Sequence, residues 1–179
     1  MTIQEFRNGI FALNTRRFGK VTEILIKKLF GYSFSNVLNY DLYDDEHHLR
    51  IEVKFSTVLK NNMVKINEEN VIDQCAKANI TNRFMSFNDK DRFPYDCNIQ
   101  QVKCDEFDIL YYGLFFADKI EIFKVPSEQV KEFPGHSNKQ HLHNEGEGQF
   151  HINKKTYKYH KDNNFLKEMT YQELLDVLR

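Results

Sequence analysis

The sequence predicts a layered α/β domain in which helices flank a mixed β-sheet. Three observations indicate this class: amphipathic helical segments open the chain, strand-like segments follow in adjacent pairs, and a helical segment closes it. Such elements bury their apolar faces by packing in layers around a shared core. The 179 residues suit one domain, and no shift in composition marks a boundary, so we expect a single domain over 1–179.

Two helices are expected at the start of the chain. Thr2 and Glu5 have the spacing of a capping box, which predicts a helix over 2–13. Apolar residues then recur at helical spacing over 15–30, and Gly31 follows as a stop signal. The second helix is therefore expected to be amphipathic.

Four strands are expected to build the sheet. Residues 36–43 and 49–55 are predicted to be strands, and the charged segment 45–48 between them predicts a hairpin loop. The apolar runs 107–116 and 120–125, joined by a short turn, predict two central, well-buried strands.

The remaining segments complete the expected order. A helix after Pro126 is typical, because proline suits the first helical position. Thr170 is a suitable cap for the last helix. The other expected elements are a helix over 71–78, a loop over 89–98, a helix from 126–127 to 132, a hairpin of 149–152 with 156–159, and a helix over 171–178.

Composition and charge exclude several classes of protein. The chain has 25 Lys+Arg against 26 Asp+Glu, which argues against a generally basic nucleic-acid binder but not against binding on one face. No apolar run is long enough for a membrane helix, and the first residues do not resemble a signal peptide. The three cysteines, Cys75, Cys97 and Cys104, indicate a reducing compartment with buried, inert thiols. We therefore expect a cytoplasmic protein.

The segment around Glu52 and Lys54 carries the clearest chemical signal. These two residues are two positions apart on an expected strand, so they point to one face while their apolar neighbours point to the other. If 45–48 is a four-residue loop, Asp44 pairs with Leu49, and Asp41 then lies opposite Glu52. Two facing carboxylates repel each other unless something offsets their charge, and a bound divalent cation such as Mg²⁺ does so.

This pattern resembles the active-site signature of the PD-(D/E)xK nuclease superfamily, which includes type II restriction endonucleases. The matching segments are Asp41-Leu-Tyr, then Arg-Ile-Glu52-Val-Lys54-Phe-Ser, although Tyr40 stands where the family usually has proline. The resemblance covers about residues 15–130, and residues 131–179 match no family that we can name.

The resemblance implies a restriction-endonuclease-like core and a role for each motif residue. Asp41 and Glu52 would bind Mg²⁺ or Mn²⁺, and Lys54 would orient or deprotonate the attacking water. Asp44 and Asp45 are rivals to Asp41, because shorter spacings also occur in the superfamily. Further members of the site are expected to be Glu23, which follows Gly19 by four residues, Gln101, from a Gln-Gln-Val-Lys run, and Ser56.

The expected partner is double-stranded DNA, bound by a homodimer at a specific sequence. The alternatives are a repair or junction-resolving nuclease, a non-catalytic DNA- or protein-binding domain of the same fold, and a plain surface hairpin whose charges are solvated.

Residues 131–160 form a possible DNA-recognition excursion from the core. Polar side chains of the kinds that contact bases and phosphates gather there. The candidates are Asn138, Lys139, Gln140, His141, Asn144, Gln149, Lys154 and Lys155. The same segment is rich in histidine, and His141 with His143 could instead bind Zn²⁺. A plain polar loop is the simplest alternative.

Overall fold

The computed structural model describes residues 1–61, 64–140 and 144–179, and within these ranges the chain forms a six-stranded and a three-stranded sheet. The six-stranded sheet has the order β1-β2-β3-β5-β6-β9; β3 and β5 are parallel and the other pairs antiparallel. Its strands are β1 (Ser33–Phe34), β2 (Leu42–Asp44), β3 (Leu49–Thr57), β5 (Ile109–Phe115), β6 (Ile120–Pro126) and β9 (Phe165–Met169). The predicted class, a mixed sheet flanked by helices, is confirmed.

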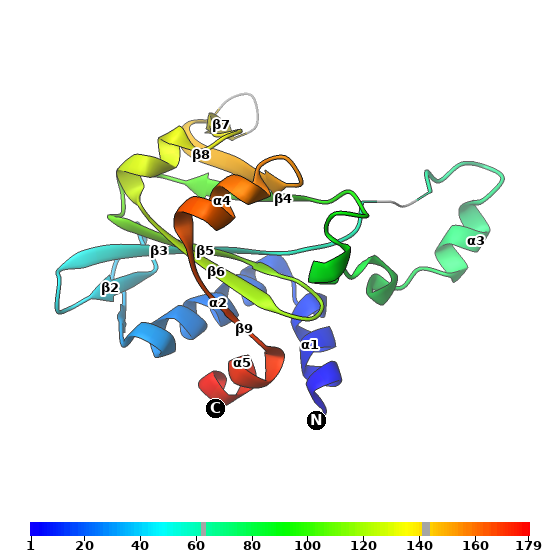
Figure 1. Cartoon of the computed structure of the whole chain (residues 1–179), viewed down its shortest axis with the longest axis horizontal. Coiled ribbons are helices and arrows are strands. Elements are labelled where there is room, and N and C mark those ends of the chain that lie inside the picture. Colours follow the sequence, from blue (N-terminus) through cyan, green and yellow to red (C-terminus); the bar gives the residue numbers. More distant parts are fainter. Residues whose placement is uncertain (62–63, 141–143) are drawn as a thin grey trace.

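Different elements pack against the two faces of this sheet. One face carries three helices, and the other carries the three-stranded sheet and a fourth helix (Figure 1). The three helices are α1 (Ile3–Ala12), α2 (Thr15–Phe30) and α5 (Tyr171–Leu178). The opposite cover consists of β4 (Asp96–Val102), β8 (Asn144–Asn153), β7 (Ser137–Gln140) and α4 (Tyr157–Asn164).

Strand β5 is apolar on both faces because both faces are covered. Tyr111 and Phe115 belong to the core beneath the helices, whereas Leu110, Tyr112 and Leu114 belong to the core beneath the three-stranded sheet. A strand buried on both sides gives a continuous apolar run rather than an alternating one. This explains the run that predicted a central strand here.

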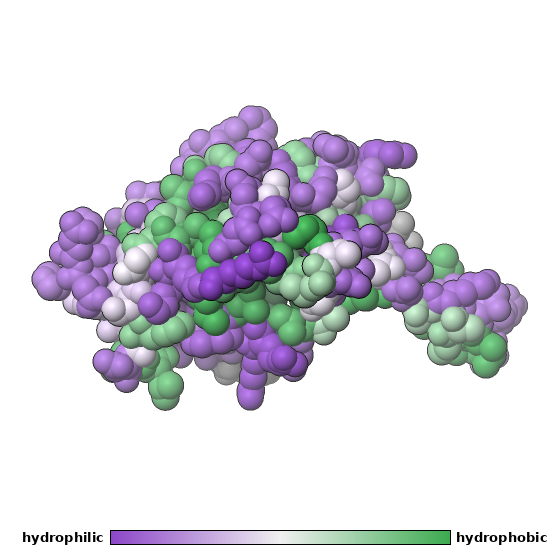
Figure 2. Space-filling view, turned by 90° about the horizontal axis from the view of Figure 1, so that it is seen from below, coloured by the Kyte–Doolittle hydropathy of each residue, from purple (hydrophilic) through white to green (hydrophobic). Residues whose placement is uncertain are grey.

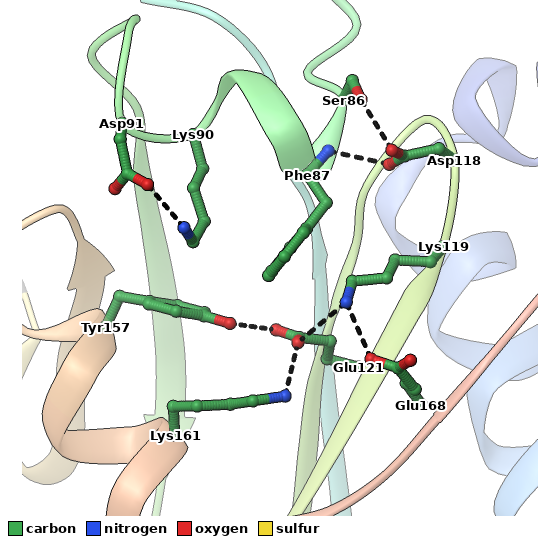
Figure 3. A network of polar contacts seen from close by, with 10 residues as sticks. All are labelled: Ser86, Phe87, Lys90, Asp91, Asp118, Lys119, Glu121, Tyr157, Lys161 and Glu168. Atoms are coloured by element: carbon green, nitrogen blue, oxygen red, sulfur yellow. Dashed lines mark hydrogen bonds and ion pairs between the residues drawn. The ribbon is translucent and has the colours of Figure 1, made fainter.

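A buried carboxylate joins α4 to the sheet. Glu121 on β6 is fully buried and accepts hydrogen bonds from the Tyr157 hydroxyl and the Lys161 ammonium of α4, both at 2.8 Å (Figure 3). Lys119 lies 3.6 Å from the same carboxylate and 3.4 Å from the centre of the Phe87 ring. A buried charge is costly unless it is paired and hydrogen-bonded, and these partners satisfy Glu121.

One segment projects from the body of the molecule. It carries α3 (Val71–Ala76), none of whose residues is buried, and the short 3₁₀ helix η1 (Ile80–Arg83). Hydrophobic side chains are exposed along it (Figure 2): Val64, Ile66, Val71, Ile72 and Ile80. In the described ranges, no helix combines the length and the apolar character needed to cross a membrane.

The expected hairpin of 149–152 with 156–159 is wrong. Residues 149–152 lie within β8, which pairs with β4 and with β7, and 156–159 form a turn and the start of α4. The expected loop over 89–98 is also wrong at its end, because β4 begins at Asp96. Both errors have one cause: β4 and β8 are far apart in the sequence, so no local pattern identifies their pairing.

Three smaller expectations also need correction. The strand expected over 36–43 is shorter, since only Leu42–Asp44 is extended and a loop precedes it. The helix after Pro126 is a 3₁₀ helix, η3 (Ser127–Glu132). Cys97 is buried as expected and Cys104 is half-buried, but Cys75 is exposed because it lies on α3.

Candidate active site

The β2–β3 hairpin places Glu52 and Lys54 on one face of the sheet. Asp44 pairs with Leu49, so the predicted register is confirmed. The apolar residues on either side of Glu52 pack in the core beneath the helices. Because side chains alternate along a strand, Glu52 and Lys54 point to the opposite face, toward the three-stranded sheet.

Asp41 lies one residue before β2 and is held against β3 by two contacts. Its backbone N–H donates to the Ile51 carbonyl at 3.1 Å, and its carboxylate accepts a hydrogen bond from the backbone N–H of Val53 at 2.9 Å. These contacts hold the carboxylate beside the strand that carries Glu52 and Lys54.

Two adjoining cavities collect the predicted site residues. A cavity of about 200 Å³ is lined by Asp41, Glu52, Lys54 and Gln101, among others. A second cavity of about 390 Å³ shares Asp41, Lys54 and Gln101 with the first and adds Glu23 from α2. Residues from α2, the β2–β3 hairpin and β4 therefore meet around one hollow, although they are widely separated in the sequence.

The rival carboxylates lie at the hairpin turn, where Asp44 ends β2 and Asp45 begins the loop, and both have hydrogen-bond partners there. Asp44 accepts hydrogen bonds from the backbone N–H groups of Glu46 and His47, both at 3.1 Å, and lies 2.9 Å from the His47 ring nitrogen. Asp45 accepts a hydrogen bond from the Ser33 hydroxyl at 2.5 Å. Neither aspartate lines the two cavities that hold Glu52 and Lys54. The geometry therefore favours Asp41 as the first carboxylate.

Burial and neighbouring charges change the pKa values of Glu52 and Lys54. Burial raises the pKa of Glu52 to about 7, and Asp41 adds to this, while Lys54 opposes it. For Lys54, burial by itself would lower the pKa, but the charges of Glu52 and Asp41 outweigh burial and raise it. The two side chains form an ion pair, and Lys54 is therefore an ammonium ion at neutral pH.

Glu23 lies at the edge of the same electrostatic group. Burial raises its pKa, the hydrogen bond from Lys20 at 2.7 Å lowers it, and the charge of Asp41 raises it again. Lys54 also lowers it. Glu23 therefore interacts with the charges of the cavity, and its nearest partner is Lys20.

The carboxylates suit a hard cation whose shell is completed by other ligands. Mg²⁺ is commonly bound by one or two carboxylates together with water and phosphate, and Asp41 and Glu52 share one cavity. Within residues 1–61, 64–140 and 144–179, no group of three or more acidic, histidine or cysteine side chains is arranged to hold a metal ion, so Glu23 does not complete such a group. Asp41 and Glu52 are the carboxylates of this cavity that would hold Mg²⁺ or Mn²⁺, with water and phosphate as the other ligands.

Gln101 has an unusual backbone. Its φ is 57°, in the left-handed region, at an irregularity of β4 between Ile99 and Val102. Residues other than glycine adopt this region at an energetic cost, and such strain is often found at functional sites. The bulge exposes Gln101 and lets it line both cavities. Ser56 lines neither, and its hydroxyl donates to the Thr57 carbonyl at 3.3 Å.

The expected DNA-recognition residues are distributed over β7, β8 and the turn after β8. Asn138 and Lys139 are exposed on β7, which pairs with the first half of β8. Lys154 and Lys155 follow the C-terminal end of β8, beyond the part of β8 that pairs with β7. Lys154 donates to the Asp91 carbonyl at 2.8 Å.

Gln149, at the centre of the expected surface, forms hydrogen bonds within the three-stranded sheet. Gln149 accepts a hydrogen bond from Asn98 at 3.1 Å and donates one to the Lys139 carbonyl at 3.2 Å. Gln140 and Asn144 belong to the backbones of β7 and β8, and His141 lies outside the described residues.

The histidines of the C-terminal third lie in different surroundings. His160 is fully buried, and its ring nitrogen lies 2.9 Å from the Tyr112 hydroxyl. His151 lies 2.7 Å from the Asp96 carboxylate at the surface. His143, like its expected zinc partner His141, lies outside the described residues.

Several residues that line the smaller cavity were not predicted from the sequence to belong to the site. Lys103 and Glu106, which both line the smaller cavity, form an ion pair at 3.6 Å, and Glu106 helps to raise the pKa of Glu52. Glu147 reaches the cavity from β8, and Leu38 and Asn39 reach it from the loop before β2. Lys103 directly follows the Gln-Gln-Val run and could have been included, but Glu147 is placed by the long-range pairing of β8 with β4.

Neither the scan against family models nor the search of curated proteins found a match for this chain. The resemblance to the PD-(D/E)xK superfamily therefore stays a prediction that depends on the motif and its geometry.

Proposed function

We propose that this protein is a Mg²⁺-dependent endonuclease that hydrolyses phosphodiesters of double-stranded DNA, in the manner of a type II restriction endonuclease. One observation carries the proposal: Asp41, Glu52 and Lys54 line one cavity. Two carboxylates and an ammonium group together can serve a divalent cation and a phosphate at once.

Each motif residue has a role in this reaction. Asp41 and Glu52 would hold the metal ion, which supplies Lewis-acid polarisation of the scissile phosphate when bound. The raised pKa of Lys54 favours its charged form, so Lys54 would orient the attacking water and stabilise negative charge on the phosphate rather than accept a proton. The water oxygen would form a new bond to phosphorus and lose a proton to solvent, while one ester P–O bond breaks and its leaving oxygen takes up a proton from solvent.

The charge balance supports a nuclease that reads its site. With a net charge of −1, the chain lacks the excess of basic residues that binding through phosphates alone requires. One chain supplies one candidate site, and a duplex has two strands. A homodimer with two-fold symmetry would therefore cut both strands at a palindromic sequence. The cytoplasm, where restriction takes place, is the compartment that this function requires.

A plasmid cleavage assay tests the proposal. Wild-type protein should convert supercoiled plasmid DNA to discrete fragments with Mg²⁺ and not with EDTA. Glu52→Gln and Lys54→Ala should each lower the cleavage rate by roughly a hundredfold or more. Asp73→Asn and Lys77→Ala are matched controls, because these residues form an exposed ion pair on α3 at 3.1 Å; both should cut as wild type does.

Other outcomes would replace the proposal. Cleavage confined to branched or mismatched DNA would identify a repair or junction-resolving nuclease. DNA binding without cleavage under Mg²⁺ or Mn²⁺ would identify a binding domain. Equal loss of cleavage in the α3 controls would remove the catalytic assignment of Glu52 and Lys54.

A further inference from the structure

A hydrophobic side chain stands at the mouth of the candidate active site without a partner. Leu38 is 104% exposed, the highest value among the large hydrophobic residues that the structure describes. Single exposed leucines are common on protein surfaces. Leu38 differs in its position, because it lines the same cavity as Asp41, Glu52 and Lys54.

The loop that presents Leu38 is held at both ends. The Ser35 N–H donates to the Asp41 carbonyl at 3.1 Å, which closes the base of the loop. The Ser35 hydroxyl accepts a hydrogen bond from the Val37 N–H and donates one to the Val37 carbonyl, both at 3.0 Å. Val37 is also exposed. The loop therefore presents two apolar side chains at its tip, and hydrogen bonds hold its backbone in place.

Basic side chains flank the start of the same loop. The Lys20 ammonium lies 4.1 Å from the centre of the Phe34 ring, and the Lys27 ammonium lies 5.4 Å from it. A ligand with an apolar interior and a negatively charged exterior would suit an apolar loop tip with lysines beside it. Duplex DNA has both, in its stacked bases and its phosphates.

Chain geometry places the tip close to the reacting phosphate. Leu38 is three residues before Asp41, so their Cα atoms are at most about 11 Å apart. A phosphate bound at Asp41 and Glu52 would therefore bring its own base step within reach of the leucine. Asn39, which is exposed beside it, belongs to a residue type that hydrogen-bonds base edges.

We propose that Leu38 is a wedge that enters the base stack of duplex DNA next to the scissile phosphate and positions the strand for cleavage. This inference rests on the proposed nuclease function. Apolar side chains inserted between base steps unstack them and kink the duplex. A second protein chain is a less suitable occupant, because a partner seated on Leu38 would cover the cavity in which the DNA must bind.

The test uses DNA that reports base stacking. A duplex containing a mapped cut site carries 2-aminopurine, which fluoresces more strongly when unstacked, beside the scissile phosphate. It is bound to the full-length protein with Ca²⁺ in place of Mg²⁺. Wild-type protein and Leu38→Met should increase the fluorescence. Leu38→Ser should abolish the increase and weaken binding about tenfold, while its melting temperature stays unchanged because the side chain is exposed.

Ile72→Ser is the matched control, since Ile72 is 78% exposed on α3, outside both cavities; it should behave as wild type does. A wild-type protein that cuts DNA without any rise in fluorescence would refute the wedge and leave the nuclease intact. If Leu38→Ser instead turned a dimer into a monomer in analytical ultracentrifugation, the loop would be a contact between copies. If the wild-type protein neither bound nor cut DNA, both proposals would be wrong.

Discussion

The backbone N–H of Val53 donates a hydrogen bond to the Asp41 carboxylate at 2.9 Å. This contact holds the carboxylate against the strand that carries Glu52 and Lys54, although Asp41 itself lies outside β2. It also means that one carboxylate oxygen has a structural partner while the side chain lines the cavity.

Substitutions at Asp41 and Asp44 should separate catalysis from stability. An asparagine at position 41 can still accept the Val53 hydrogen bond, so Asp41→Asn should change the free energy of unfolding by less than about 1 kcal/mol. Its cleavage rate should fall roughly a hundredfold or more, because a charged metal ligand is lost. Plasmid cleavage and urea unfolding measure the two effects.

The opposite result is expected at Asp44. Asp44→Ala removes the acceptor for two backbone N–H groups of the hairpin loop, and should lower the free energy of unfolding by about 1–3 kcal/mol. The folded fraction should cut at the wild-type rate. A loss of cleavage at Asp44 with full activity in Asp41→Asn would make Asp44 the first carboxylate.

Gln101→Gly should make the protein more stable and less active. Glycine adopts positive φ without the steric cost that Gln101 bears, so the free energy of unfolding should rise by about 1 kcal/mol. The loss of a side chain that lines both cavities should lower cleavage. His48→Gly is the control, because His48 also has a positive φ, 58°, but lies in the hairpin loop. Equal cleavage by the two variants would assign Gln101 a purely structural role.

His160 should make the fold sensitive to acid. Burial lowers its pKa to about 4 from an ordinary value of 6.5, so the unfolded chain binds more protons than the folded protein between these values. The free energy of unfolding should therefore fall as pH decreases from about 6.5 to 4, by up to roughly 3 kcal/mol. Urea unfolding of wild type and His160→Gln across this range measures the difference. Parallel pH profiles would rule out His160 as its source.

Two glycine substitutions should have opposite effects on stability. A Cβ atom at Gly113 in β5 would overlap the Phe55 ring and lie 2.5 Å from the Glu121 carbonyl oxygen. Gly113→Ala should therefore lower the free energy of unfolding by about 1–3 kcal/mol or more. Gly9, inside α1, has nothing within 4 Å of a Cβ, and Gly9→Ala should raise it by roughly 0.5–1 kcal/mol. Thermal melts of both variants measure these changes; a stabilised Gly113→Ala would show that β3 and β5 can separate locally.

Local rules predicted the parts of the fold that depend on neighbouring residues. The capping box of Thr2 and Glu5 is present at the start of α1, and a second one, of Thr170 and Glu173, is present at α5. The register of the β2–β3 hairpin follows from its loop length. The pairing of β4 with β8 was missed, because their partners lie about fifty residues apart and leave no local pattern.

Side chains alternate along any strand, so the spacing of Glu52 and Lys54 alone puts them on the face opposite to their apolar neighbours. The surroundings of that face depend on long-range packing. The parallel pairing of β3 with β5 and the cover of β4 and β8 enclose the polar pair in a cavity with Asp41, Gln101 and Glu147. These contacts join residues from distant segments, and their formation depends on the burial of the whole core rather than on any local preference.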